Sequence, residues 1–142
     1  MYKFLAAGIL AMLVLSGCVR NDRIYHVAEN PWAESFGNHR AVLDIQNDAE
    51  AVRIDLPWRR HDRDPQKRRL MLVSAESGDT VSNIHRIRVD QEVCEILAGP
   101  LKAGTYYFYY LPFEVQEGYG FYNRDYLPVE EAPDPRWKEE IE

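Results

Sequence analysis

Polar and apolar residues alternate along several short stretches of this chain, which is the pattern of β-strands with one buried and one exposed face. The clearest stretch has Val52, Ile54, Leu56 and Trp58 on one face and Arg53, Asp55 and Pro57 on the other. Further stretches bounded by Gly, Pro, Asn and Asp predict strands at residues 40–45, 70–74, 81–89, 92–97 and 105–111. This succession predicts an all-β protein, an antiparallel β-sandwich of the immunoglobulin-like or jelly-roll-like kind.

Four stretches add detail to the predicted architecture. Residues 105–111 carry large aromatics on both faces, so we expect a central strand there. Residues 59–67 lack apolar side chains and predict an exposed connection. Residues 118–126 interleave Tyr119, Phe121, Tyr122 and Tyr126 with glycines, which favours an exposed aromatic loop. Residues 134–142 are predicted to be a short helix or linker, with Asp134 as N-cap and Pro135 in the first turn.

The N-terminus has the pattern of a bacterial export signal. Lys3 precedes an apolar run from Phe4 to Leu15, which is shorter than the about 20 residues that a spanning helix needs. The following residues, Leu15-Ser16-Gly17-Cys18, resemble the lipobox of bacterial lipoproteins. We therefore expect a signal peptide at residues 1–17, lipid on Cys18, a tether at 18–38 that partly packs on the domain, and a sandwich at 39–133.

Lipidation would place the protein on a membrane of the cell envelope. Lipoproteins of this kind carry two or three acyl chains, enough for durable anchoring, whereas one chain holds only weakly. Val19 follows the cysteine where retention at the inner membrane favours Asp, so the outer membrane is the expected location. A secreted protein in which Cys18 is incidental is the alternative.

Net charge, cysteine content and histidine spacing limit the partners and cofactors that we expect. The net charge of −6 and the dispersed basic residues argue against nucleic acid as a partner. Once Cys18 is lipidated, Cys94 is the remaining thiol, and its place in an apolar stretch predicts a core residue. The four histidines share no ligand spacing, so we expect neither a metal nor another cofactor.

Two motifs carry a family resemblance: residues 54–60, Ile-Asp-Leu-Pro-Trp-Arg-Arg, and residues 104–112, Gly-Thr-Tyr-Tyr-Phe-Tyr-Tyr-Leu-Pro. Together with Asp64-Pro65 and Ser77-Gly78 they resemble the N-terminal domain of proteins similar to glycoside hydrolase family 123. The resemblance covers residues 38–137. It implies a β-sandwich that precedes a catalytic (β/α)8-type barrel with β-N-acetylgalactosaminidase activity.

In that family the catalytic Asp-Glu pair lies in the barrel, and this chain offers no matching positions for it. The resemblance therefore implies an accessory domain without catalysis of its own, which supports glycan hydrolysis. Two alternatives stay open: a stand-alone surface lipoprotein that binds carbohydrate, and the truncated front part of an enzyme.

Two pairs of neighbouring carboxylates are candidates for independent catalysis, because glycoside hydrolysis uses an acid and a second carboxylate. The pairs are Asp62 with Asp64 and Glu130 with Glu131. Both lie in polar stretches without an apolar wall to raise one pKa, so we expect solvated loop charges and no catalytic role.

Aromatic and arginine side chains are the candidates for binding a glycan or docking a domain. The candidate residues are Trp58, Arg59, Arg60, Tyr107, Tyr109, Tyr119 and Tyr122. Tyrosine and tryptophan rings can stack on sugars, and arginine can bind hydroxyls or acidic groups. The structural alternative is that Trp58 closes the core, the arginines pair with nearby Asp, and one tyrosine face packs internally.

Overall fold

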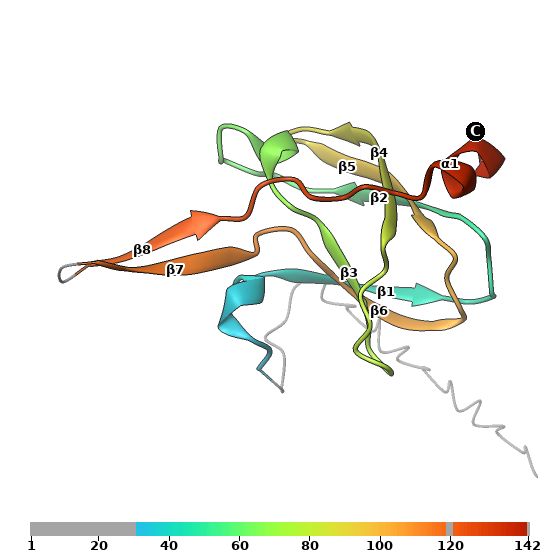
Figure 1. The fold of residues 1–142 in the computed structure, drawn as a ribbon, viewed down its shortest axis with the longest axis horizontal. Coiled ribbons are helices and arrows are strands. Elements are labelled where there is room, and N and C mark those ends of the chain that lie inside the picture. The colour runs from blue at the N-terminus through green and yellow to red at the C-terminus, as the bar shows by residue number, and fades with distance from the viewer. Residues whose placement is uncertain (1–30, 119–120, 142) are drawn as a thin grey trace, which may run out of the picture. The chain divides into compact units, whose positions relative to one another are not determined.

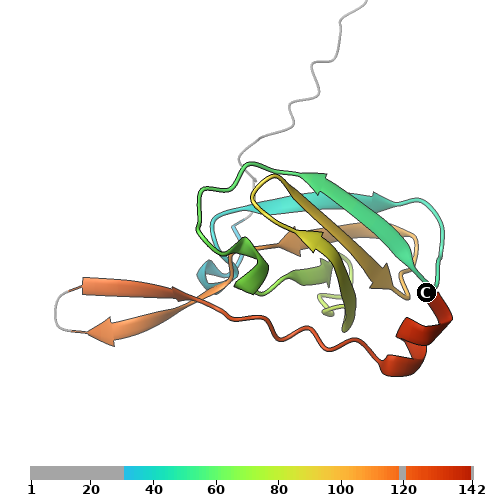
Figure 2. The same cartoon turned by 90° about the horizontal axis from the view of Figure 1, so that it is seen from above.

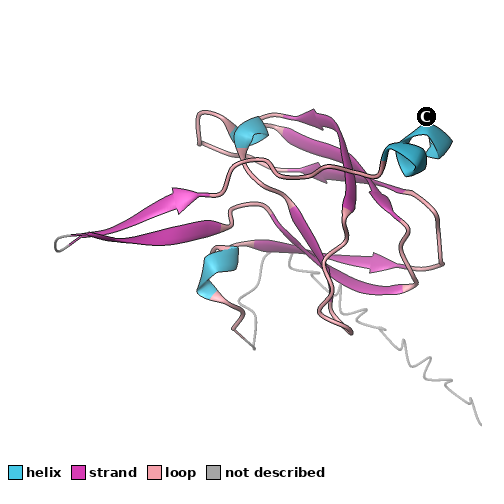
Figure 3. Ribbon diagram, in the orientation of Figure 1, coloured by secondary structure: helices cyan, strands magenta, loops and turns pink. Residues whose placement is uncertain are grey.

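The computed structural model describes residues 31–118 and 121–141 of the 142 residues. The predictions for the signal peptide and for Cys18 lie outside the described residues. Contacts divide the chain into a unit from Met1 to Pro31 and a compact unit from Trp32 to Glu142. The elements of the second unit are η1 (Glu34–Phe36), β1 (Arg40–Ile45), β2 (Val52–Pro57), η2 (Pro65–Lys67), β3 (Met71–Ser74), β4 (Asn83–Val89), β5 (Val93–Gly99), β6 (Gly104–Tyr109), β7 (Phe113–Gly118), β8 (Phe121–Tyr126) and α1 (Pro135–Ile141) (Figures 1 and 3).

Six strands form two three-stranded antiparallel sheets, ordered β1-β6-β3 and β2-β5-β4 (Figure 1). The predicted strands are therefore confirmed, and β6 is the central strand of its sheet as its aromatic residues indicate. In β4 the register shifts between Arg86 and Arg88, so Ile87 is an extra residue at the sheet edge and is exposed.

The inner faces of the two sheets share one hydrophobic core. Leu72 of β3 lies directly opposite Phe108 of β6, and both are fully buried. Ile96 of the other sheet is also fully buried in the same cluster. Residues Val52, Leu56 and Trp58 pack against this core around the buried Ile54, as their alternation predicts. The predicted antiparallel sandwich is confirmed.

The loop predicted at 118–126 is wrong for the residues of this stretch that the structure describes, which lie in strands. Residues Phe121–Tyr126 form β8, which pairs with β7 from Phe113↔Tyr126 to Gly118↔Phe121. The ribbon projects from the two sheets at the end opposite α1 (Figures 1 and 2). Pairing with β7 along its whole length explains why residues 121–126 form a strand, although the adjacent glycines favour a loop.

The C-terminal helix forms as predicted. Asp134 Oδ1 accepts hydrogen bonds from the amides of Arg136 (2.7 Å) and Trp137 (3.4 Å), which caps the N-terminus of α1. Trp137 is 7% exposed and its indole N–H donates to the Glu50 carbonyl at 2.9 Å, so it pins α1 to the sandwich. In the described part of the chain, no helix has the length and apolar character needed to cross a membrane.

Candidate functional site

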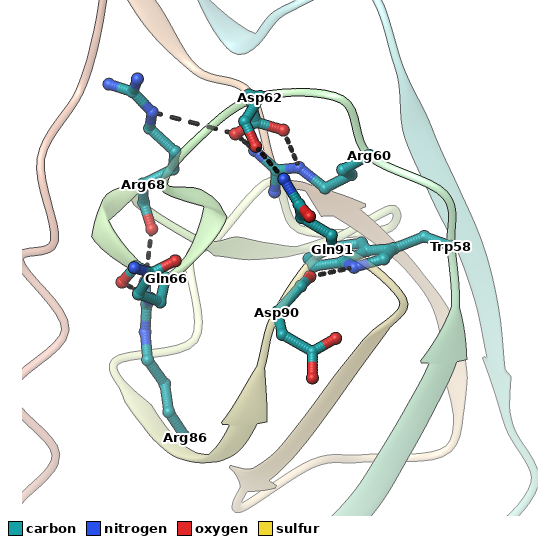
Figure 4. A network of polar contacts seen from close by, with 8 residues as sticks. All are labelled: Trp58, Arg60, Asp62, Gln66, Arg68, Arg86, Asp90 and Gln91. Atoms are coloured by element: carbon teal, nitrogen blue, oxygen red, sulfur yellow. Dashed lines mark hydrogen bonds and ion pairs between the residues drawn. The ribbon is translucent and has the colours of Figure 1, made fainter.

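Trp58 follows β2 and is half-buried at one end of the core. Its indole N–H donates to the Asp90 carbonyl at 2.7 Å, in the connection between β4 and β5 (Figure 4). Its ring lies 5.2 Å from the ring of Tyr110, centre to centre. Trp58 thus joins the end of β2 to two other parts of the fold.

Arg60 is buried, contrary to the exposure predicted for residues 59–67. Its side chain is 4% exposed, and Nε and Nη2 donate to the two carboxylate oxygens of Asp62 at 2.8 and 2.7 Å (Figure 4). Its guanidinium carbon lies 4.8 Å from the ring centre of Trp58 and 5.5 Å from that of Tyr110. A cation can be buried in this way because it is paired and lies against aromatic rings.

The other residues of this connection differ in exposure. Arg59 and His61 are exposed, as the sequence indicates, whereas Pro65 is buried in η2. The tertiary fold therefore separates the two adjacent arginines: Arg60 points into the structure, and Arg59 remains at the surface.

Arg86 of β4 joins three segments that are distant in sequence. Its Nη1 donates to the Gln66 carbonyl at 2.7 Å, and its Nη2 donates to the Arg68 carbonyl at 2.5 Å (Figure 4). Nη2 also donates to Glu131 Oε1 at 2.6 Å, and the same oxygen accepts the Leu70 amide. Arg86 and Glu131 thus hold the 65–70 segment and the chain before α1 together.

Asp62 and Glu131 are not solvated loop charges, which corrects the sequence-based expectation. The Glu131 side chain is 6% exposed and that of Asp62 is 21% exposed. The pattern of neighbouring residues gave no signal for this burial, because Arg86 reaches Glu131 from another strand. We call Arg60, Asp62, Arg68, Arg86 and Glu131 the polar cluster.

The remaining two carboxylates are also engaged in ion pairs. Asp64 lies 3.3 Å from Lys67 Nζ, and Glu130 pairs with Arg69. Each of the four carboxylates considered for catalysis therefore has a basic partner. Among residues 31–118 and 121–141, no group of three or more His, Cys, Asp or Glu residues is placed to hold a metal ion.

The outer face of β6 is covered by the chain that precedes β1. Tyr109 is 3% exposed beneath Trp32 and Phe36, whose ring centres lie 6.0 and 4.9 Å from its own. The guanidinium carbon of Arg40 lies 4.3 Å from the ring centre of Trp32 and 3.8 Å from that of Tyr107. This covering leaves Tyr107 half-buried, and neither tyrosine forms an open platform.

The two remaining candidates lie near the tip of the ribbon. Tyr119 is outside the described residues. Tyr122 is described only through its backbone, which belongs to β8 opposite Glu117.

A small hollow of about 80 Å³ opens at the base of the ribbon. It is lined by Gly37, Asn38, His39, Leu111, Phe113, Arg124 and Tyr126, which we call the ribbon hollow. Phe113 is 2% exposed, whereas Tyr126 is 38% exposed, in agreement with the exposure predicted for Tyr126. Leu111 belongs to the 104–112 motif, but nothing in the sequence grouped it with the other lining residues, because three separate segments form the hollow.

Cys94 is fully buried in β5. Burial raises the pKa of its thiol to about 12, because the thiolate would lose its hydration. The thiol is therefore neutral at physiological pH, which supports the core role predicted for Cys94.

A match to a family model shows which family the domain belongs to. The model of the glycoside hydrolase 123 N-terminal domain matches residues 30–142. The chain belongs to this family. No curated protein and no solved structure matches the chain.

The two motifs of the family resemblance meet in space. Trp58 and Arg60 come from the Pro-Trp-Arg-Arg segment, and both contact Tyr110 at the end of the Tyr-Tyr-x-Tyr-Tyr segment. In this member of the glycoside hydrolase 123 N-terminal family, the motifs join the ends of β2 and β6, one from each sheet.

Proposed function

We propose that this domain is a non-catalytic accessory module that supports a glycan-hydrolysing catalytic domain. The observation that carries the proposal is the family match, which spans residues 30–142 and so includes the whole compact unit. The ion pairs of Asp62, Asp64, Glu130 and Glu131 support it, because each of these carboxylates already contacts a basic side chain of the domain.

An activity assay tests the non-catalytic part of the proposal. The purified chain is incubated with an aryl β-N-acetylgalactosaminide, and release of the aryl alcohol is followed. We expect no turnover above the buffer rate. Turnover that survives repeated purification would show that the chain is itself an enzyme.

A second experiment tests the supporting role. The gene is read downstream of the codon for Glu142, and any catalytic domain encoded there is produced with and without this chain. We expect the thermal stability or the kcat/KM of the catalytic domain to fall when the accessory domain is removed. Identical values with and without the domain would contradict the proposal.

Arg59 provides a specific test of docking. It is exposed, whereas the adjacent Arg60 is buried in the polar cluster. If this surface docks the catalytic domain, Arg59→Ala weakens association while the fold of the accessory domain is retained. His61→Ala, at another exposed position of the same connection, is the matched control.

We also propose that Cys18 carries the lipid that anchors the protein to the cell envelope, with the outer membrane as its location. The support is the lipobox-like Leu15-Ser16-Gly17-Cys18 after a short apolar run. Cells are fed an alkyne analogue of palmitate, and the protein is tested for label. Cys18→Ser should abolish labelling and Cys94→Ala should retain it; label that survives Cys18→Ser would refute the assignment.

A further inference from the structure

Tyr126 is the most open aromatic side chain among those that the structure describes. It is 38% exposed, whereas the other described Phe, Tyr and Trp side chains are buried or half-buried. Arg40 lies against Tyr107, Arg60 against Trp58 and Arg68 against Tyr126, so a nearby cation is common to these rings and exposure is what distinguishes Tyr126. The accessible aromatic surface therefore lies at the ribbon hollow.

Three segments fix the shape of the ribbon hollow. Gly37 has φ 88°, and a Cβ atom there would lie 2.4 Å from the Leu111 carbonyl oxygen. This close approach brings residues 37–39 next to the start of β7. The guanidinium carbon of Arg68 lies 5.2 Å from the ring centre of Tyr126. The wall that Tyr126 forms is thus supported by the polar cluster.

The ribbon hollow combines apolar and hydrogen-bonding groups. Phe113 and Leu111 provide apolar surface, and Tyr126 adds an aromatic ring. Arg124 Nη2 donates to Glu34 at 3.0 Å, and its guanidinium carbon lies 4.8 Å from the ring centre of Phe113. A guanidinium has five N–H donors, so this side chain can bind a further acceptor while it keeps its ion pair.

We propose that the ribbon hollow is a subsite for one sugar ring of a glycan. The C–H face of a pyranose is apolar and packs on aromatic surface, while its hydroxyls can accept hydrogen bonds from Arg124 and exchange them with His39 and Asn38. The choice of a glycan as ligand rests on the proposed function. Sugar binding by the domain itself would place it in contact with the polymer that the catalytic domain hydrolyses.

The size of the ribbon hollow sets the expected affinity. Its volume of about 80 Å³ is smaller than the about 300–1,000 Å³ of pockets that enclose a drug-sized ligand. A sugar ring would therefore remain partly in water, and we expect a dissociation constant of about 1 mM or weaker. Such an affinity becomes useful when several subsites act on one polymer chain.

Nuclear magnetic resonance tests the subsite. The chain from Val19 to Glu142, which contains the whole compact unit, is labelled with ¹⁵N and titrated with galactose, N-acetylgalactosamine and an oligosaccharide that contains them. We expect amide shifts concentrated at residues 37–39, 111–113 and 124–126. Absence of shifts at sugar concentrations far above about 1 mM, or shifts confined to another surface, would overturn the proposal.

Matched variants separate sugar binding from folding. Tyr126→Ala should weaken binding at least about tenfold, whereas Tyr126→Phe should stay within about threefold. Arg124→Ala and Glu34→Ala break the same ion pair, but Glu34→Ala leaves the guanidinium in place. Binding should therefore fall in Arg124→Ala and persist in Glu34→Ala. Equal affinity in Tyr126→Ala and wild type, with both folded, would overturn the proposal.

The supporting role is measured separately from the subsite. When the domain is joined to a catalytic domain, Tyr126→Ala should reduce hydrolysis of a long glycan and leave hydrolysis of an aryl glycoside unchanged. If no sugar binds while removal of the whole domain still lowers activity, the subsite proposal fails and the accessory role stands. If removal of the domain has no effect, the accessory role fails whatever the titration shows.

Discussion

The two sheets of the sandwich and the β7–β8 ribbon consist of similar short antiparallel strands, but they differ in what covers them. Each sheet buries its inner face against the other, with Leu72, Ile96 and Phe108 fully buried. The ribbon pairs only with itself, and Val115 on it is 44% exposed. A two-stranded ribbon is marginal alone, so stability comes from the sandwich and the ribbon is free to present side chains.

Near its base the ribbon is attached to the sandwich by specific contacts. The Arg69 amide, before β3, donates to the Leu127 carbonyl at 2.9 Å, while the Leu127 amide donates to the Pro112 carbonyl at 2.9 Å and closes the base of the ribbon. Phe113 is buried where the ribbon begins. The ribbon hollow lies at this attachment, where exposed side chains of the ribbon meet the sandwich.

The largest expected effect comes from the sandwich core. Phe108→Ala removes a fully buried ring between the two sheets and should lower the free energy of unfolding by about 3–5 kcal/mol. Val115→Ala on the ribbon should change it by less than about 0.5 kcal/mol, because the side chain is largely exposed. Urea denaturation followed by tryptophan fluorescence measures both. Similar losses in the two variants would contradict the division into a stabilising sandwich and a presenting ribbon.

A smaller loss of stability is expected when an ion pair of the polar cluster is broken. Glu131→Gln removes the buried charge that faces Arg86 and should lower the free energy of unfolding by about 2–4 kcal/mol. This loss is somewhat smaller than the loss expected for a fully buried ion pair, because the Arg86 side chain is 19% exposed. Glu130→Gln is the matched control: the Glu130 side chain is 68% exposed, and its pair with Arg69 should contribute less than about 1 kcal/mol. Equal destabilisation by the two changes would show that burial of Glu131 has no energetic importance.

The attachment of the ribbon is tested at Gly37. Gly37→Ala strains a backbone with φ 88° and also drives a Cβ atom onto Leu111, so we expect a loss of about 2–3 kcal/mol. Gly78→Ala has a similar φ of 77° with nothing within 4 Å of the added Cβ, and should cost only about 1 kcal/mol. Thermal unfolding of the two variants isolates the steric contribution. A larger loss in Gly78→Ala would contradict the close approach of Gly37 and Leu111.

The smallest effect is a pH dependence at the connection between β4 and β5. The amides of Glu92 and Val93 donate to Asp90 and lower the pKa of its carboxyl group, with a further contribution from Arg88. Because the folded pKa is below the unfolded value of about 3.9, the stabilisation is present above that pH and is lost as pH falls through the folded pKa.

Asp90→Asn tests this dependence, because the amide oxygen can still accept the two backbone hydrogen bonds but carries no charge. Urea midpoints of variant and wild type should differ at neutral pH and converge in strong acid. A difference that is independent of pH would assign the effect of the substitution to geometry and not to charge.

Short-range sequence patterns predicted the strands well because alternation and turn residues act locally. The strand near Ile54, the central β6 and the cap at Asp134 all depend on neighbouring residues, and the structure confirms them. The same rule gave the wrong result at residues 121–126, where pairing with β7 decides the conformation. Pairing partners are not encoded in the composition of one segment.

The predicted sites depended on contacts between distant segments and were harder to foresee. The use of Trp58, Arg59, Arg60, Tyr107, Tyr109, Tyr119 and Tyr122 for glycan binding or domain docking stays a prediction. The sequence identified Tyr126 as an exposed aromatic residue. It contained no signal for the hollow beside Tyr126, since Gly37 and Leu111 approach each other only in the folded chain.

The sequence by itself determined the all-β class, the positions of six sandwich strands, the C-terminal helix and the family resemblance, because these follow from side-chain periodicity, local hydrogen bonding and motifs. The tertiary structure alone decided which polar residues are buried. Arg60 and Glu131 are adjacent to exposed residues of the same charge, yet each is withdrawn from water by a partner or an aromatic surface that the fold supplies. Burial of a charge depends on what lies across from it in space, and only the folded chain specifies that neighbour.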